Sequence, residues 1–433
     1  MRNDVSFRDA LAVWWRIGVL SFGGPAGQIA LMHRELVEER RWLDETRFLH
    51  ALNYCMLLPG PEAQQLATYV GWLLHGVRGG LVAGLLFILP GALAILLLSC
   101  LYVTLGNLAP VEGLFFGLKA AVLAIVCQAL LRIAGRALTS TFTRVLAVAG
   151  FIALFVFALP FPLVVLGAGG LAYLLARGRG PTDSRPETPL QPDRAGERRA
   201  RLAALVCLLL WAGTLAGLSL MLGSSHPLTQ IANFFFRMAV VTFGGAYAVL
   251  SYVAQQAVEQ YHWLAPGEML DGLGLAETTP GPLILVTQFV GFLGAWRHLG
   301  GEASLLAGMA GALVTTWVTF LPCFLWIFAG APYVERLREH HALREALAAI
   351  TAVVVGVIAN LALWFGLNFL FADMQRLQAL GVDMPLPVLA SLGLPNLLLT
   401  GLAFVLVFLL RLNMLITLLC CALLGMAWTL ISL

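Results

Sequence analysis

The chain has 433 residues, of which 60% are apolar and only 11% charged, and its mean hydropathy of +0.87 lies far above that of ordinary soluble domains. These values exclude a soluble globular protein and predict an all-α polytopic membrane protein. The net charge of +3 is small. Because the arginines gather in a few connecting segments, this charge indicates membrane topology and excludes a nucleic-acid partner.

The first half of the chain holds six apolar segments. Its opening residues carry Arg8, Asp9 and Arg16 within an apolar stretch and offer no small-residue cleavage site, so we expect no removable signal peptide. We expect a helix at membrane depth in each segment. The segments run roughly over residues 7–31, 49–74, 80–105, 111–131, 143–158 and 160–176.

A hydrophilic stretch separates the two halves. Residues 177–201 hold seven arginines, four acids and four prolines, a composition that predicts a mobile cytoplasmic linker. Further apolar segments follow at roughly 202–223, 228–253, 269–296, 303–330, 345–370, 385–410 and 412–432. All but the first match the first half in order. The predicted domains are therefore a first repeat (1–176), the linker (177–201), a connecting transmembrane helix (202–223) and a second repeat (224–433).

One set of motifs occurs twice, 221 residues apart. The copies are Ser21-Phe22-Gly23-Gly24 with Pro59-Gly60-Pro61, and Thr242-Phe243-Gly244-Gly245 with Pro280-Gly281-Pro282. Glycine and proline break helices, and an unpaired backbone group at membrane depth costs several kcal/mol. Such breaks are expected only where they line a polar path, so they predict one here.

Loop charges predict that the second repeat has inverted topology. The loop 34–47 is rich in arginine, whereas its counterpart 254–268 has no Lys or Arg. The difference in arginine content then reverses, because loop 106–113 has no Lys or Arg whereas its counterpart 336–344 carries three arginines. An odd helix between two homologous halves turns the second half over, and 202–223 is such a helix.

A count of full spans back from the linker would place loop 34–47 outside, against the arginine rule. The conflict disappears if the Pro59-Gly60-Pro61 segment is a re-entrant hairpin, and the Gly23-Gly24-Pro25 segment is a candidate for a second one. Plain kinked spans at these motifs are the alternative.

The helices that begin after the motifs predict an anion site. A helix start offers free backbone N–H groups and the positive end of the helix dipole, and proline suits such a start. The alternative is that the glycines allow close helix packing and the amides bond between helices. The predicted substrate-binding residues are Gly23, Gly24, Pro25, Gly60, Pro61, Gln64, Gln65, Lys119, Gly244, Gly245, Thr278, Thr279, Gly281, Pro282 and Gln288.

Lys119 is the only lysine in the chain and lies within an apolar run. A cation there costs roughly 2.5–3.5 kcal/mol on insertion scales, so an anionic substrate or a carboxylate such as Glu62 or Glu277 is expected to compensate it. Snorkelling to the membrane interface is the alternative.

Glu62 and Glu277 lie near the two Pro-Gly-Pro motifs and are candidates for proton coupling. Arg16 and Arg237, in equivalent positions before the two Phe-Gly-Gly motifs, are supporting charges that either face the breaks or snorkel.

Four stretches of the sequence are Phe22-Gly23-Gly24-Pro25, Leu58-Pro59-Gly60-Pro61, Gly117-Leu118-Lys119-Ala120-Ala121-Val122 and Glu277-Thr278-Thr279-Pro280-Gly281-Pro282. Together, in this order, they resemble the chromate ion transporter family in its long, two-domain form. The resemblance covers nearly the whole chain from about Phe7. It implies export of chromate across the bacterial inner membrane, driven by the proton-motive force and sensitive to sulfate. The sequence departs from the family's pattern in its second half, where Gly244-Gly245-Ala246 stands at the position equivalent to Gly23-Gly24-Pro25.

The membrane potential also favours export, because the free energy of a dianion falls by about 4.6 kcal/mol per 100 mV when it leaves a negative-inside cell. The alternative function is a sulfate or related oxyanion permease, since sulfate and chromate are both tetrahedral dianions. An enzyme is not expected, because no Ser-His, paired-Asp or His-Glu-x-x-His arrangement appears at membrane depth. The cysteines lack metal-ligand spacing, so we expect no metal site and no cofactor. Such transporters are commonly homodimers, but no residue here argues for one.

Overall fold

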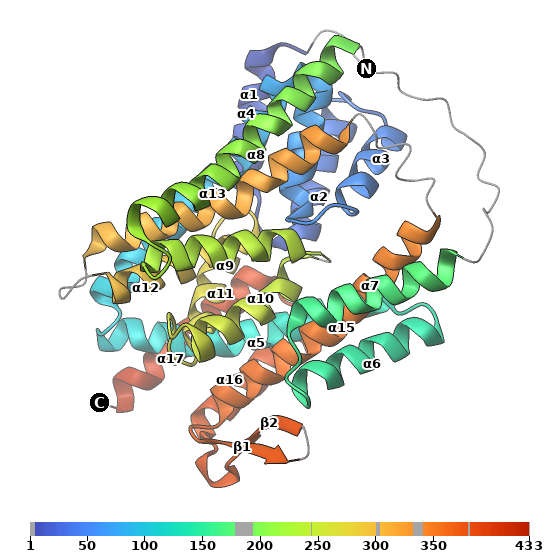
Figure 1. The fold of residues 1–433 in the computed structure, drawn as a ribbon. Coiled ribbons are helices and arrows are strands. Elements are labelled where there is room, and N and C mark those ends of the chain that lie inside the picture. The colour runs from blue at the N-terminus through green and yellow to red at the C-terminus, as the bar shows by residue number, and fades with distance from the viewer. Residues whose placement is uncertain are drawn as a thin grey trace. The chain divides into compact units, whose positions relative to one another are not determined.

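The computed structural model describes residues 5–177, 194–243, 245–299, 304–331, 341–379 and 382–432 (Figure 1). Helices dominate this part of the chain. The α-helices are α1 (Phe7–Leu20), α2 (Gly24–His33), α3 (Glu45–Cys55), α4 (Glu62–Leu105), α5 (Ala109–Ala137), α6 (Thr141–Phe155), α7 (Phe161–Arg177), α8 (Arg194–Leu222), α9 (Pro227–Val241), α10 (Ala246–Gln255), α11 (Glu268–Thr278), α12 (Val286–His298), α13 (Leu305–Gly330), α15 (His341–Leu370), α16 (Leu394–Phe404) and α17 (Met414–Ser432). The shorter elements are the π-helical turns η1 (Arg34–Glu39), η2 (Gln256–Gln260) and η6 (Val405–Leu409), the 3-10 turns η3 (Leu283–Leu285) and η5 (Leu389–Ser391), and the strands β1 (Met374–Ala379) and β2 (Val382–Pro387).

Six of the described helices are long and apolar enough to cross a membrane, namely α4, α5, α8, α13, α15 and α17. Large apolar side chains cover their outer surfaces. Leu220, Leu306 and Ile431 are each more than three quarters exposed, an arrangement that water disfavours and a lipid environment accepts. The protein is therefore an all-α polytopic membrane protein, as its composition predicted.

The described residues form two compact units. Unit 1 consists of the described residues within 1–99, 181–246 and 279–341, and unit 2 of those within 100–180, 247–278 and 342–433. Each unit combines segments of both predicted repeats. The repeats of the sequence therefore do not coincide with the compact units.

In unit 1, α13 packs against α8, α9 and α12 (Figure 1). The chain reverses inside α4 at His75 and Gly76, where the backbone is not helical and Gly76 has φ +61°. The two arms of α4 then meet at Gly71 and Gly79, where a Cβ on either glycine would overlap the carbonyl oxygen of the other. The separate segments 49–74 and 80–105 that the sequence predicted are therefore joined by a tight turn.

In unit 2, α5 packs against α11, α16 and α17. The closest approach is again made by glycines, because a Cβ on Gly117 would overlap the Cys421 carbonyl and a Cβ on Gly113 would lie 2.6 Å from Thr429 Oγ1. Small residues let two helix backbones approach each other where no water is released by packing.

The predicted apolar segment 385–410 is only partly helical. Its first residues belong to β2, which pairs antiparallel with β1 from Met374 opposite Pro387 to Ala379 opposite Val382. Pro385 and Pro387 carry no backbone N–H and disfavour a helix. The helix α16 begins at Leu394, with Pro395 in its first turn.

Candidate functional site

The first copy of the motifs breaks two helices. Between α1 and α2, Gly23 and Gly24 have φ of +88° and +67°, and Pro25 occupies the first turn of α2. Between α3 and α4, Gly60 has φ +125° and is followed by Pro61. Left-handed backbone of this kind favours glycine. The breaks predicted from the sequence are confirmed at both motifs.

The second copy shows the same pattern. The α9 helix ends at Val241 and α10 begins at Ala246, after Gly245 with φ +95°. The α11 helix ends at Thr278, and η3 and α12 begin after Gly281 with φ +95° and Pro282. Gly244, predicted to bind the substrate, lies outside the described residues. In the part of the chain that the structure describes, one helix therefore ends before each of the four motifs and another begins within or after it.

The two copies meet within unit 1 by reciprocal hydrogen bonds. Gly60 donates its backbone N–H to the Thr242 carbonyl at 2.8 Å, and Gly281 donates its own to the Ser21 carbonyl at 3.0 Å. Gly281 corresponds to Gly60, and Thr242 corresponds to Ser21. Each Pro-Gly-Pro therefore contacts the Phe-Gly-Gly break of the other repeat, as a two-fold relation between the repeats would require.

The partners behind the two Pro-Gly-Pro motifs are also equivalent. A Cβ on Gly281 would lie 3.3 Å from Gly91 Cα in α4, and a Cβ on Gly60 would lie 3.0 Å from Cys323 Sγ in α13. Gly91 and Cys323 are 232 residues apart, the spacing that also relates Leu118 to Ile350. Close packing of glycine against a facing helix is therefore one role of these motifs.

Buried amides brace the breaks. Gln65 donates to the Pro59 carbonyl at 2.7 Å, and Gln28 donates to the Gly281 carbonyl at 2.6 Å. Gln288 donates to the Ala92 carbonyl at 2.9 Å, and Gln64 donates to Thr68 Oγ1 at 3.0 Å. Each of these amide groups thus has at least one N–H engaged by the protein, and the backbone N–H groups of the helix starts are further donors available to an anion.

Lys119 in unit 2 pairs with a residue that the sequence reading missed. Its Nζ lies 3.2 Å from Asp271 Oδ2, and the Tyr102 hydroxyl donates to the same oxygen at 3.0 Å. The Asp271 side chain is only 3% exposed. A carboxylate therefore compensates Lys119, as expected, but it is Asp271 and not Glu62 or Glu277, the two examples named from the sequence. The sequence feature that could have identified Asp271 is its position as an acidic residue within the apolar segment 269–296.

Glu277 is a second buried carboxylate of unit 2, and it accepts a hydrogen bond from the Tyr247 hydroxyl. The positive charge of Arg132 also acts on both groups. The neighbouring Thr278 donates to the Leu275 carbonyl at 2.9 Å within its own helix, and Thr279 is buried. A carboxylate held in this way at membrane depth is either a paired structural group or a proton carrier.

The remaining charges differ between the repeats. Arg16 Nε lies 3.2 Å from Glu35 Oε1, and Arg40 Nε lies 3.5 Å from the buried Glu35 Oε2. Arg237 is exposed, and glutamine occupies the position that corresponds to Glu35. Arg16 therefore has a structural partner, whereas no described residue pairs with Arg237.

Glu62 is half-buried in the first turn of α4, directly after the Pro59-Gly60-Pro61 break. Among the described residues it has no hydrogen-bond or ion-pair partner. A carboxylate at this position interacts favourably with the helix dipole and repels any anion that approaches the same helix start.

Comparison with known proteins gives a consistent result. A family model described as chromate transporter matches residues 8–174 and 229–426. A chromate transport protein of Pseudomonas aeruginosa is 32% identical over 360 residues, which cover 82% of this chain and 80% of that protein. A chromate transport protein of Cupriavidus metallidurans is 28% identical over 362 residues, which cover 82% and 81%. A probable chromate transport protein of Synechococcus elongatus is 28% identical over 356 residues, which cover 82% and 83%. No solved structure matches the chain significantly.

Proposed function

This multi-pass bacterial membrane protein belongs to the chromate transporter family, which supports a role in chromate transport, and we propose that it exports chromate from the cytoplasm. The membrane potential or the proton-motive force drives this export. The observation that carries the mechanism is the reciprocal contact between the Pro-Gly-Pro and Phe-Gly-Gly breaks of the two repeats. It brings helix starts from both repeats together within unit 1.

We place the anion at the free N–H groups of these helix starts. The start of α2 at Gly24 is partly accessible, and within the described residues no side chain caps it. Its unpaired N–H groups and the helix dipole suit an oxyanion. Pro25 has no counterpart in the second repeat, so we propose that the first repeat contributes more to binding.

Proton coupling follows from the position of Glu62. When ionised, its carboxylate repels a dianion from the start of α4, and when protonated it does not. Glu277 is the second candidate, because burial of its carboxyl group opposes ionisation whereas the Tyr247 hydroxyl and the positive charge of Arg132 favour it. Chromate and a proton would then affect each other's occupancy of the protein.

Alternating access between inverted halves is the proposed transport cycle. The reciprocal hydrogen bonds support a two-fold relation between the repeats, and the alternating arginine content of the loops supports an axis that inverts one of them. The potential favours the outward direction, because a dianion gains about 4.6 kcal/mol per 100 mV on leaving a negative-inside cell.

Uptake of labelled chromate into everted membrane vesicles tests the direction. An imposed interior-positive potential of 100 mV should raise accumulation by up to roughly two thousandfold for uncoupled dianion movement, and less if a charge is co-transported. Vesicles without the protein provide the baseline. Absence of any potential- or pH-gradient-driven uptake would contradict export, and faster transport of sulfate than of chromate would favour an oxyanion permease instead.

Substitution Glu277→Gln tests proton coupling. Glutamine keeps the size of the side chain and an acceptor for Tyr247 but cannot titrate, so the pH dependence of chromate uptake at fixed potential should flatten. Initial rates from pH 6 to pH 8 measure this. Glu112→Gln, at an exposed acid in the first turn of α5, is the matched control and should keep the normal profile. An unchanged profile in Glu277→Gln would remove this residue from coupling.

A further inference from the structure

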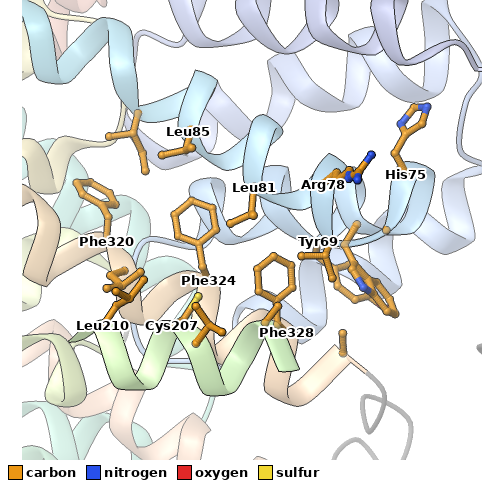
Figure 2. A pocket seen from close by; sticks show the side chains of 18 of the residues that line it. Tyr69, His75, Arg78, Leu81, Leu85, Cys207, Leu210, Phe320, Phe324 and Phe328 are labelled. Carbon is orange, nitrogen blue, oxygen red and sulfur yellow. The ribbon is translucent and has the colours of Figure 1, made fainter. Parts of the chain in front are cut away.

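A long apolar cavity lies within unit 1, between α4, α8 and α13 (Figure 2). Leu81 and Leu85 of α4 face Phe320, Phe324 and Phe328 of α13 across it, and α8 closes it with Cys207 and Leu210. Its volume is about 1430 Å³, which exceeds the roughly 300–1,000 Å³ of a typical small-molecule pocket. The cavity therefore fits a long apolar molecule better than a compact polar one.

One end of this cavity is cationic. Figure 2 shows Arg78 and His75 together at the end away from Leu210. Arg199 also lines the cavity from α8, eleven residues before Leu210, which places it toward the same end. Neither Arg78 nor Arg199 forms a hydrogen bond or an ion pair with a described residue, and no Asp or Glu is among the described residues that line the cavity. This end therefore offers an anion two guanidinium groups that no described residue neutralises.

The shape and the charge together identify one class of ligand. The cavity follows α8 from Gly196 to Leu210, about 21 Å at the helical rise, whereas the hydrocarbon of one leaflet is about 15 Å thick. One acyl chain therefore fits along it, with a headgroup at the arginines. A free oxyanion such as chromate would gain contacts mainly at the cationic end. The polar residues Gln288 and Thr316 also line the cavity, but they are engaged with the Ala92 carbonyl and with each other.

We propose that this cavity binds one acyl chain of an anionic phospholipid from the cytoplasmic leaflet, with the phosphate held by Arg78 and Arg199. Arg199 lies in the segment 177–201, and Arg47, which also lines the cavity, lies in the loop 34–47. The arginine rule assigns both segments to the cytoplasm. Anionic lipids bind basic pockets between helices on that side. Only 11% of the apolar window of α8 is buried inside the protein, so lipid has direct access to this helix.

Photo-crosslinking of the full-length protein tests this site. The protein is reconstituted in phosphatidylcholine vesicles that contain a trace of phosphatidylglycerol or phosphatidylcholine with a diazirine on one acyl chain, and the adducts are mapped by mass spectrometry. We expect phosphatidylglycerol adducts on cavity residues of α8 and α13. The double variant Arg78→Gln/Arg199→Gln should lower them by about 25-fold, at about fivefold for each arginine. The variant Arg198→Gln, at an exposed arginine of α8 that does not line the cavity, should leave them unchanged.

Competition by small anions and a substitution that fills the cavity distinguish a bound phospholipid from a bound free anion. Inorganic phosphate or chromate at millimolar concentration should not displace the adducts, because neither fills the apolar part. Ala203→Trp should abolish them without a change of charge, and Ala203→Leu should reduce them if the tryptophan variant does not fold by its melting curve. Equal adducts from the two lipids, displacement by free phosphate or chromate, or full labelling in a folded Ala203→Trp protein would each overturn the proposal.

Discussion

Substitution Lys119→Met is expected to abolish chromate uptake while the protein still inserts into the membrane. Met removes the ammonium group but keeps the length of the apolar stem. Asp271 is then left buried without its cation, with Tyr102 as its remaining hydrogen-bond donor. Removal of one partner of a buried pair costs about 3–5 kcal/mol, so we expect a lower melting temperature in detergent as well as the loss of flux. Lys119→Arg should retain a fraction of the uptake.

A second substitution separates stability from transport. The double variant Lys119→Met/Asp271→Asn removes both charges, so its melting temperature should rise toward that of the natural protein. If the ammonium group acts on the substrate, uptake stays absent in this double variant. Arg136→Met, at an exposed residue in the last turn of the same helix α5, is the control and should change neither quantity. Normal uptake by Lys119→Met would leave Lys119 only its structural pairing with Asp271.

Substitutions Gly60→Ala and Gly281→Ala are expected to have the second largest effect. Both glycines have positive φ, +125° and +95°, which strains an L-residue by about 1–3 kcal/mol. A Cβ would also lie 2.8 Å from Gln65 Nε2 at Gly60 and 3.1 Å from Leu285 Cδ1 at Gly281. Either methyl group would disturb a crossing between the two repeats. We therefore expect at least a tenfold loss of chromate uptake in each variant.

Two further glycines make this test specific. Gly91 does not have a left-handed backbone, but a methyl group at this position would overlap the Pro280 carbonyl. Gly91→Ala should therefore reproduce the loss of uptake through packing alone. Gly213→Ala in α8 meets no atom within 4 Å and should leave uptake unchanged with a slightly higher melting temperature. Initial uptake rates and melting curves measure both. Normal uptake by Gly60→Ala and Gly281→Ala together would show that the crossings are not needed for transport.

Local features of the sequence predicted the class of protein and the positions of the helix breaks. Hydropathy predicts burial in lipid directly, and Gly60 and Gly281 lie at breaks because few other residues adopt a left-handed backbone without strain. The resemblance to the family also rests on short ordered motifs, which a sequence displays by itself. None of these inferences depends on contacts between distant residues.

Only the tertiary structure determined which residues face each other. Lys119 pairs with Asp271, 152 residues away, because α5 packs against α11, and the sequence offered Glu62 and Glu277 as equally plausible partners. Likewise, the two copies of the motif looked independent along the chain, yet Gly60 contacts Thr242 and Gly281 contacts Ser21. The physical reason is that the energetic cost of burying a charge or an unpaired backbone group shows only that a partner is needed. Which partner is present depends on how the helices pack.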